Sequence, residues 1–256
     1  MSSCAPDGVA ARPSLALPGS HRLAAVGKPS AARLFDAAAM ALYPWLARAF
    51  GYRFRVGLDE ALVADGRSVH RAVWAEIGVD PGALDATLSQ RYARAASCWI
   101  VAYHGDAPVG AMALCDLRVA SVTLDFEGCL PPRGIDLART REIAKLAILK
   151  AHRGHGQLVM VGLLREMLVW SKRAGIVQLF GGSEQRHYRM YRRFNPTARL
   201  HDKRPGPPQP ESLVRYYQPL RRWSGPSVLF SFEVQGASPW RVFSDLVARK
   251  LGRRRA

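Results

Sequence analysis

The amino-acid sequence predicts a protein of the α+β, or mixed α/β, class. Between residues 98 and 126, apolar stretches of strand length follow one another around polar turns, a pattern typical of an antiparallel meander. Apolar residues at helical spacing precede and follow that region. Further along, the chain alternates strand, glycine-containing loop, helix and strand. Together these observations predict a central, mostly antiparallel sheet flanked by helices.

The region before the meander is predicted to be mainly helical. From residue 30 to residue 50 the apolar residues recur at helical spacing, and Pro44 is expected to break or kink this element. We expect it to pack on the core; the alternative is an interfacial helix on a membrane surface, because Arg33 and Arg48 flank its aromatic face. One strand and two helices are then predicted, at Tyr52 to Val56, Asp59 to Ala64 and Ser68 to Ile77.

The sheet and its covering helices are predicted from the rest of the chain. Four strand-like segments come first, at Cys98 to Tyr103, Pro108 to Leu117, Ser121 to Phe126 and Thr140 to Leu149. A helix, a strand, a short helix, a strand and a basic helix follow, at Val159 to Ala174, Ile176 to Phe180, His187 to Arg193, Val228 to Val234 and Trp240 to Leu251. Gly175 is expected to end the first of these helices.

Length and composition favour one domain. A chain of 256 residues that is 48% hydrophobic suits one substantial core. We expect this domain over residues 30–256, after a disordered leader at residues 1–29 that is rich in Ala, Pro, Gly and Ser. The leader lacks the basic end and apolar core of a secretory signal. No apolar run approaches the roughly 18 to 20 residues that cross a bilayer. We therefore expect a cytoplasmic protein, with contact at the inner membrane as an alternative.

Cysteine usage and charge limit the classes of ligand and partner. The four cysteines have neither CxxC spacing nor a nearby histidine set, so the sequence predicts no metal site and no disulfide framework. The formal net charge is +17, which attracts acidic partners such as nucleic acid, anionic lipid or an acidic carrier protein. Because no nucleic-acid module signature is present, nucleic acid is not the expected partner.

A glycine-containing loop is the first candidate binding site. The segment Arg153-Gly154-His155-Gly156-Gln157-Leu158 joins a predicted strand to a predicted helix. Glycines there let backbone N–H groups face outward at the positive end of the helix, where phosphate binds. The alternative is a tight turn without a ligand. It is not a Walker loop, because no Gly-Lys-Ser/Thr follows.

This loop, as Arg153-x-x-Gly156-x-Leu158, resembles the pyrophosphate loop of the GNAT superfamily of acyl-CoA N-acyltransferases. Leu158 stands where that superfamily has a small residue. Met190 to Phe194 resembles a later helix of the same superfamily. The resemblance implies a GNAT-like fold, no tightly bound cofactor, and acyl-CoA or a phosphopantetheine thioester on acyl carrier protein as donor substrate. It also implies that the donor contacts Ala147, Ile148, Leu149, Arg153, Gly154, His155, Gly156, Gln157 and Leu158.

A second resemblance concerns the predicted strand before the loop. The run Arg141-Glu142-Ile143-Ala144-Lys145-Leu146-Ala147 is similar to a strand motif of acyl-homoserine lactone synthases and bacterial N-acyl amino acid synthases, which use fatty acyl groups. Lys145 replaces the arginine of that motif, so a bidentate contact would become a single one. The earlier segment Arg71 to Gly78 is similar to their substrate-binding segment. The resemblance thus implies that Arg71, Trp74 and Lys145 bind substrate.

Glu142 is the candidate proton acceptor. A carboxylate beside a closed, apolar site can accept a proton from an attacking amine, directly or through water. The alternative is a salt bridge with Arg139 or Arg141 at the strand end. Along a regular strand Glu142 and Lys145 would face opposite sides of the sheet, unless a bulge intervenes.

Tyr191 is the candidate proton donor. It matches the position where many GNAT members place a tyrosine that protonates the leaving thiolate. Tyr188 lies one helical turn earlier and is the alternative. Ordinary packing of a phenol on a helix would explain either residue.

The sequence therefore predicts an N-acyltransferase. We favour a long-chain acyl group, carried on acyl carrier protein or on CoA and transferred to the amine of an amino acid or similar small molecule. One alternative is an acetyl-CoA-dependent N-acetyltransferase of a small amine or protein lysine. Another is a degenerate acyltransferase fold that serves as a binding module. The expected partners are acyl carrier protein and a small-molecule amine.

Overall fold

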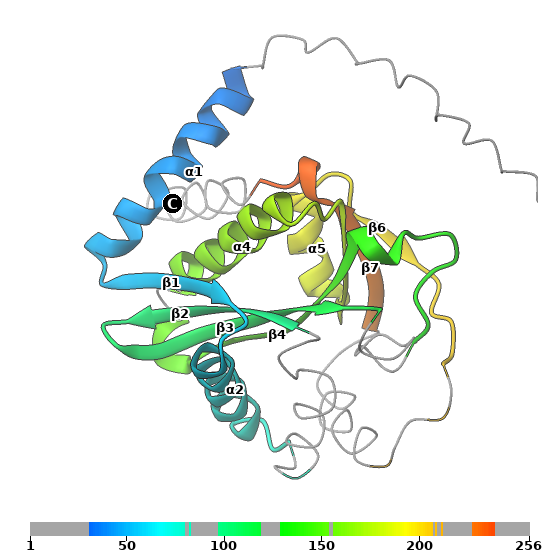
Figure 1. Ribbon diagram of the computed structural model, residues 1–256, viewed down its shortest axis with the longest axis horizontal. Helices are drawn as coiled ribbons and strands as arrows, with labels where there is room; N and C mark the ends of the chain where they lie inside the picture. Colours follow the sequence, from blue (N-terminus) through cyan, green and yellow to red (C-terminus); the bar gives the residue numbers. More distant parts are fainter. Residues whose placement is uncertain are drawn as a thin grey trace, which may run out of the picture.

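A mostly antiparallel sheet forms the centre of the protein (Figure 1). The computed structural model describes residues 31–79, 82, 97–118, 129–153, 156–206, 208, 211 and 227–238. Within them, seven strands lie in the order β1-β2-β3-β4-β5-β7-β6. Only the β4–β5 pair is parallel. The strands are β1 (Tyr52–Gly57), β2 (Ser97–His104), β3 (Ala107–Asp116), β4 (Thr140–Ile148), β5 (Gln178–Glu184), β6 (Arg199–His201) and β7 (Ser227–Glu233).

Helices cover both faces of this sheet. They are α1 (Ala31–Ala49), α2 (Glu60–Ala75), α4 (Gly156–Arg173) and α5 (Gln185–Phe194), joined by the 3₁₀ turns η1 (Leu137–Arg139), η2 (Lys150–His152) and η3 (Val234–Gly236). In Figure 1, α1, α4 and α5 lie on one side of the sheet and α2 on the other. The predicted mixed α/β class, with a mostly antiparallel sheet flanked by helices, is confirmed.

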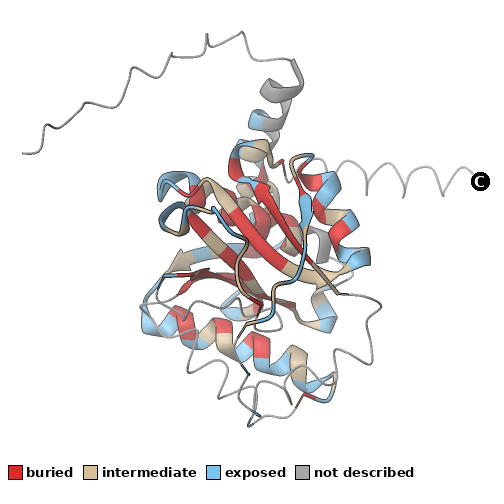
Figure 2. Ribbon diagram, turned by 90° about the vertical axis from the view of Figure 1, so that its right-hand side faces the viewer, coloured by how far each residue is buried: buried red, intermediate tan, exposed pale blue. Residues whose placement is uncertain are grey.

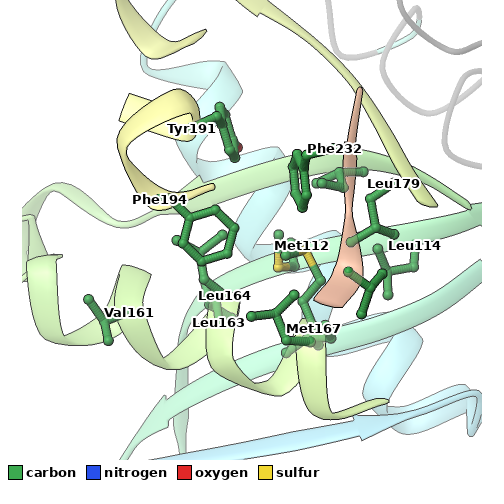
Figure 3. Close-up of a cluster of buried hydrophobic side chains, with 14 of the residues drawn as sticks. Met112, Leu114, Val161, Leu163, Leu164, Met167, Leu179, Tyr191, Phe194 and Phe232 are labelled. Atoms are coloured by element: carbon green, nitrogen blue, oxygen red, sulfur yellow. The ribbon is translucent and has the colours of Figure 1, made fainter. Parts of the chain in front are cut away.

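The face under α4 and α5 holds the main core (Figure 3). Apolar side chains of α4 such as Leu164 and Met167 meet alternate residues of β3, and those of α5 meet β7. Phe194 and Phe232 pack edge to face, with ring centroids 5.6 Å apart. This face is closed almost entirely by hydrocarbon, which is the main source of stability in a domain of this size.

The face under α2 holds a smaller core. Leu62, Val63 and Val69 of α2 pack on Trp99 and on small residues of β3. The helix begins at Asp59, whose carboxylate accepts the N–H of Leu62 at 2.9 Å, a typical N-cap. Figure 2 shows buried residues along the central strands and alternating buried and exposed residues along the helices, as amphipathic packing requires.

The prediction of two helices between residues 59 and 77 is wrong, because α2 runs unbroken from Glu60 to Ala75. Gly66 lies inside it and faces the sheet. A Cβ atom at this position would lie 2.2 Å from the indole of Trp99. Gly66 is thus a site of close packing between helix and strand and does not end the helix. Gly78, with φ of +77°, lies in the turn after this helix.

The expected break at Pro44 is also absent, because α1 is continuous through it. A proline has no N–H to donate to the carbonyl four residues earlier, which is that of Met40. Arg165 of α4 donates its Nε–H to this carbonyl oxygen at 2.8 Å. A side chain of the neighbouring helix therefore replaces the missing backbone hydrogen bond.

The other predicted elements agree with the structure within a few residues, apart from one strand that was not predicted and three segments that the structure does not describe. The short edge strand β6 was not predicted. The predicted strand Ser121 to Phe126, the predicted helix Trp240 to Leu251 and the leader at residues 1–29 lie outside the described residues. No described helix is long and apolar enough to cross a membrane.

Candidate functional site

Strand β4 carries the predicted proton acceptor. Ile143 belongs to the core under α4, whereas Ala144 and Ala147 pack in the core under α2. Glu142 is paired with Cys115 of β3 and Phe180 of β5, residues of the clusters on the α2 face. Partners directly opposite share a face of the sheet, so the Glu142 carboxylate lies on the α2 face, where it is 2% exposed.

A β-bulge at Lys145 changes the direction of the next side chain. In the β3–β4 pair, Ala111 is opposite Ala147 and Ala113 opposite Ala144, so Met112 alone is opposite two residues. Lys145 has φ of +57°, and among the described residues it is the one non-glycine with a positive φ. Such a conformation costs about 1–3 kcal/mol and occurs mainly at functional sites.

The bulge brings Lys145 to the same face as Glu142. Its side chain is buried, and its charge acts on His70 of α2. On a regular strand the two residues would have faced opposite sides. From the sequence, only a bulge could place both residues on the same face, and the structure contains this bulge.

The parallel strands β4 and β5 separate at this same level. Their pairing runs from Thr140–Gln178 to Ile143–Gly181. Beyond it β4 continues to Ile148, while β5 continues to Glu184 in pairing with β7. Ala147, Ile148 and Leu149, expected to contact the donor, lie on the strand end past this separation.

The predicted phosphate loop follows directly. The turn η2 and Arg153 lead into α4, which begins at Gly156. Gly154 and His155 lie outside the described residues, as does the side chain of Gln157. The positive end of an 18-residue helix is thus directed at the loop, and its first backbone N–H groups lack partners within the helix.

Arg153 is bound to the protein itself. Its Nε donates to the Ile148 carbonyl at 2.9 Å and its Nη2 to the Glu76 carboxylate at 3.1 Å. Arg153 therefore connects the end of β4 with the end of α2, directly before the predicted phosphate loop continues into α4.

Leu158 packs against the core under α4, and its carbonyl accepts a hydrogen bond from the Tyr43 hydroxyl of α1. The larger side chain is thus accommodated as the first core residue of the helix.

Tyr191 lies on the opposite face of the sheet from Glu142. Its ring is buried, 4.7 Å from that of Phe230 between centroids (Figure 3 shows Tyr191 on α5). Phe230 lies over Gly181, where an added Cβ would be 2.8 Å from the ring. Since Gly181 is the last β5 residue paired with β4, Tyr191 lies at the level where the strands separate. Burial raises the pKa of Tyr191 to about 12, so the phenol keeps its proton and can donate it.

Tyr188, the alternative proton donor, has another role in the structure. Its hydroxyl donates to the Ala198 carbonyl at 3.3 Å. It therefore ties α5 to the segment before β6.

The two predicted substrate-binding residues of α2, Trp74 and Arg71, differ in burial. Trp74 is half-buried and stacks on His70, with ring centroids 5.1 Å apart. Arg71 is exposed. His70 was not among the residues predicted from the sequence, although its four-residue spacing from Trp74 places both on one side of a helix.

A hollow at the other end of β4 and β5 is lined by charged residues, among them Arg139, Lys172, Arg199 and Glu233. It lies beside the first residues of the two strands, whereas the loop follows the last residue of β4. None of the predicted site residues lines it.

Comparisons with known proteins found similarity only among solved structures. No family model matches the chain, and no curated protein matches it. One similar structure is FeeM, an N-acyl amino acid synthase from uncultured soil microbes, at 11% identity and a TM-score of 0.47, covering 72% of this chain and 91% of that one. Another is the acyl-homoserine lactone synthase LasI, at 11% identity and a TM-score of 0.46, with 75% and 95% covered.

A third is a GNAT family acetyltransferase from Brucella melitensis in complex with acetyl-CoA, at 17% identity and a TM-score of 0.41, covering 63% of this chain and 92% of that one. At these identities the three matches describe a likeness of fold.

Proposed function

We propose that the protein is an N-acyltransferase that moves an acyl group from a pantetheine thioester to the amine of a small molecule. The observation that supports this most strongly is the coincidence of four features at one level of the sheet. There, β4 and β5 separate, Lys145 forms a bulge, and Glu142 and Tyr191 are buried on opposite faces. A thioester lying between the separated strands would have a proton acceptor on one side and a proton donor on the other.

The donor is proposed to enter along the separated part of β4, past Ala147 to Leu149. Its phosphate would then lie at the N-terminal end of α4, where backbone N–H groups and the helix dipole favour negative charge. The arm between phosphate and thioester would follow the last residues of β4. We thus propose residues 147–149 and 153–158 as the donor site.

The proposed reaction is a direct transfer. The amine nitrogen attacks the thioester carbonyl, strand N–H groups near the bulge stabilise the oxyanion, and the C–S bond breaks. Glu142 takes a proton from the amine, and Tyr191 gives one to the leaving thiolate. No nucleophile from the enzyme is required.

A carrier protein is proposed as the source of the thioester. Along α5 the buried residues Tyr188, Tyr191 and Phe194 alternate with the exposed Arg189, Arg192 and Arg193. The outer side of the helix that carries the proposed proton donor is therefore strongly basic. Such a surface would attract an acidic acyl carrier protein and orient it toward the site.

The exposed side of α1 supports membrane contact as an additional property. Trp45 is 73% exposed and Leu42 65% exposed, whereas Tyr43 and Ala47 are buried. Binding to vesicles with and without anionic lipid, compared between the wild type and Trp45→Glu, tests this contact. Equal binding by both proteins would contradict it.

The test of the function measures thiol release with palmitoyl acyl carrier protein, palmitoyl-CoA and acetyl-CoA, each with a pool of amino acids, and identifies products by mass spectrometry. We expect preferred turnover of the long-chain carrier thioester and an N-acyl amino acid product. Preference for acetyl-CoA would instead indicate an acetyltransferase. No thiol release from any donor would contradict the enzymatic proposal.

The carrier-protein contact is tested by replacing Arg189, Arg192 and Arg193 together with Glu. We expect the KM for acyl carrier protein to rise at least about tenfold, and to rise less steeply at high salt, where exposed charges are screened. The matched control changes Arg139, Lys172 and Arg173 to Glu, an equal change of charge at the far end of the sheet. Equal effects of the two variants would show a general effect of charge and contradict a docking surface on α5.

A further inference from the structure

His70 is a buried polar residue to which the proposed chemistry gives no role. It lies on α2 with no exposed surface, and its ring stacks on Trp74 with an angle of 23° between planes. Within the described part of the chain, neither ring nitrogen of His70 has a hydrogen-bond partner. Burying such a group costs about 1–3 kcal/mol. Since an apolar side chain of similar size would avoid this cost, stability alone does not explain a histidine here.

The surroundings of His70 connect it to the proposed site. His70 stacks on Trp74, and Trp74 packs in the same cluster as Ala144 and Ala147 on either side of the bulge. His70 therefore lies near the bulge of β4, where the positive charge of Lys145 also acts on its ring. Lys145 is two residues beyond Ile143, the last residue of β4 paired with β5. Glu142 precedes the bulge on the same face. The imidazole is therefore on the α2 side of the opening where the thioester is proposed to lie.

On the basis of the acyl transfer proposed above, we propose that His70 touches the acceptor amine and accepts a proton from it, while Lys145 binds the carboxylate of the same acceptor. The acceptor class that fits is an α-amino acid, which carries an amine and a carboxylate on one carbon atom. A single ammonium group suits one carboxylate, which it binds as a point charge.

The protons of the reaction balance with this assignment. An amino acid enters as an ammonium ion and leaves as an amide, so its nitrogen loses two protons while the C–N bond forms and the C–S bond breaks. Glu142 accepts one and His70 the other. The leaving thiolate takes its proton from Tyr191, which regains one afterwards, and one proton in total is released.

The charge state of His70 agrees with this role. Burial, and secondly the charge of Lys145, lower the pKa of His70 well below its usual value. The ring is thus neutral before the acceptor binds, which is the form that accepts a proton. A carboxylate bound to Lys145 offsets the lysine charge, so binding of the acceptor itself makes His70 more basic.

The first test compares His70→Gln and His70→Phe with the wild type. We expect kcat to fall about 100-fold in both, with the KM for the acyl donor unchanged, since a proton acceptor contributes roughly that factor. The matched control is His201→Gln, which changes a histidine on the same face that bonds to Ser231 at 2.7 Å and should keep kcat. Added imidazole should restore part of the rate of His70→Gly, which loss of packing alone would not allow. Wild-type kcat in His70→Gln would overturn the assignment.

A second test separates the acceptor carboxylate from its amine. Lys145→Met should raise the KM for an amino acid about 10- to 100-fold, a loss of about 1.4–2.7 kcal/mol, and change the KM for the matching amine without a carboxylate much less. The preference of the wild type for the amino acid over the carboxylate-free amine should therefore be lost in the variant. An equal loss with both acceptors would overturn the role of Lys145.

A binding measurement separates failure of this inference from failure of the proposed function. In protein with isotope-labelled histidine rings, the resonance that disappears in His70→Gln is that of His70. We expect amino acids to shift it and carboxylate-free amines to shift it less. Absence of thiol release from every donor would overturn the acyl transfer, yet a shifted resonance would still support the acceptor site. If the wild type acylates amino acids but these amino acids do not shift the His70 resonance, the inference about His70 is overturned while the proposed acyl transfer stands.

Discussion

The two faces of the sheet bury different kinds of residue. Under α4 and α5, aromatic and aliphatic side chains close the core, and Tyr191 lies among aromatic rings. Under α2, the same sheet buries His70, Glu142 and Lys145. Buried charge is costly unless it is paired or serves chemistry. The first face therefore supplies most of the stability, whereas the second carries most of the residues to which we assign the chemistry.

The largest expected difference between the faces is in stability. Phe232→Ala on the α4 face should lower the free energy of unfolding by about 3–5 kcal/mol, because it leaves a cavity in the main core. Ser231→Ala, one residue away on the α2 face, should cost only about 1–2 kcal/mol, from loss of the hydrogen bonds with His201 and Gln178. Urea denaturation measures both, and equal losses would contradict the division.

The next expected effect is on catalysis. Glu142→Gln keeps the size of the side chain but removes its ability to take a proton, so kcat should fall about 100- to 1000-fold while the KM for the donor stays the same. Asp106→Asn, at an exposed carboxylate that pairs with Arg53, is the control and should leave kcat unchanged. Steady-state kinetics measures kcat for both variants. An unchanged kcat in Glu142→Gln would show that the Glu142 carboxylate does not take part in the reaction.

The smallest expected effect separates two tyrosines of one helix. Tyr191→Phe should keep stability within about 0.5 kcal/mol and lower kcat about 10- to 100-fold, because only the proton donor is lost. Tyr188→Phe should do the reverse: it loses the hydrogen bond to Ala198, about 0.5–1.5 kcal/mol, and keeps its rate. Thermal unfolding and steady-state kinetics of both variants measure these opposite effects on stability and kcat. A lower kcat in Tyr188→Phe than in Tyr191→Phe would contradict the assignment.

Most elements could be predicted from the sequence, because their apolar periodicity is decided locally. The errors occur where a distant residue decides. Gly66 lies between the two helices predicted at Asp59 to Ala64 and Ser68 to Ile77, but it belongs to one continuous helix, where the indole of Trp99 requires a glycine. Pro44 looked like a break, but Arg165 supplies a donor from another helix. β6 has only three residues, too few to show a period.

The site was predictable as a set of residue types but not as an arrangement. Glu142 and Lys145 share a face only because of a bulge, and a bulge has no periodic signature in the sequence. His70 was missed because a histidine in a helix carries no signal of burial by itself. The role proposed for it depends on Lys145, which is 75 positions away in the chain but close enough in the fold for its charge to act on the ring.

The order of the strands also determines how long β5 remains without its partner strand during biosynthesis. β7 lies between β5 and β6, so a growing chain has made β5 and α5 well before their partner strand leaves the ribosome. Until residue 233 emerges, β5 is bordered only by a four-residue pairing with β4, and the rings of Phe230 and Phe232 are absent from its side. An apolar strand edge exposed in this way invites chaperone binding or aggregation. Nascent chains arrested before β7 should therefore remain sensitive to protease, and those released beyond it should become resistant.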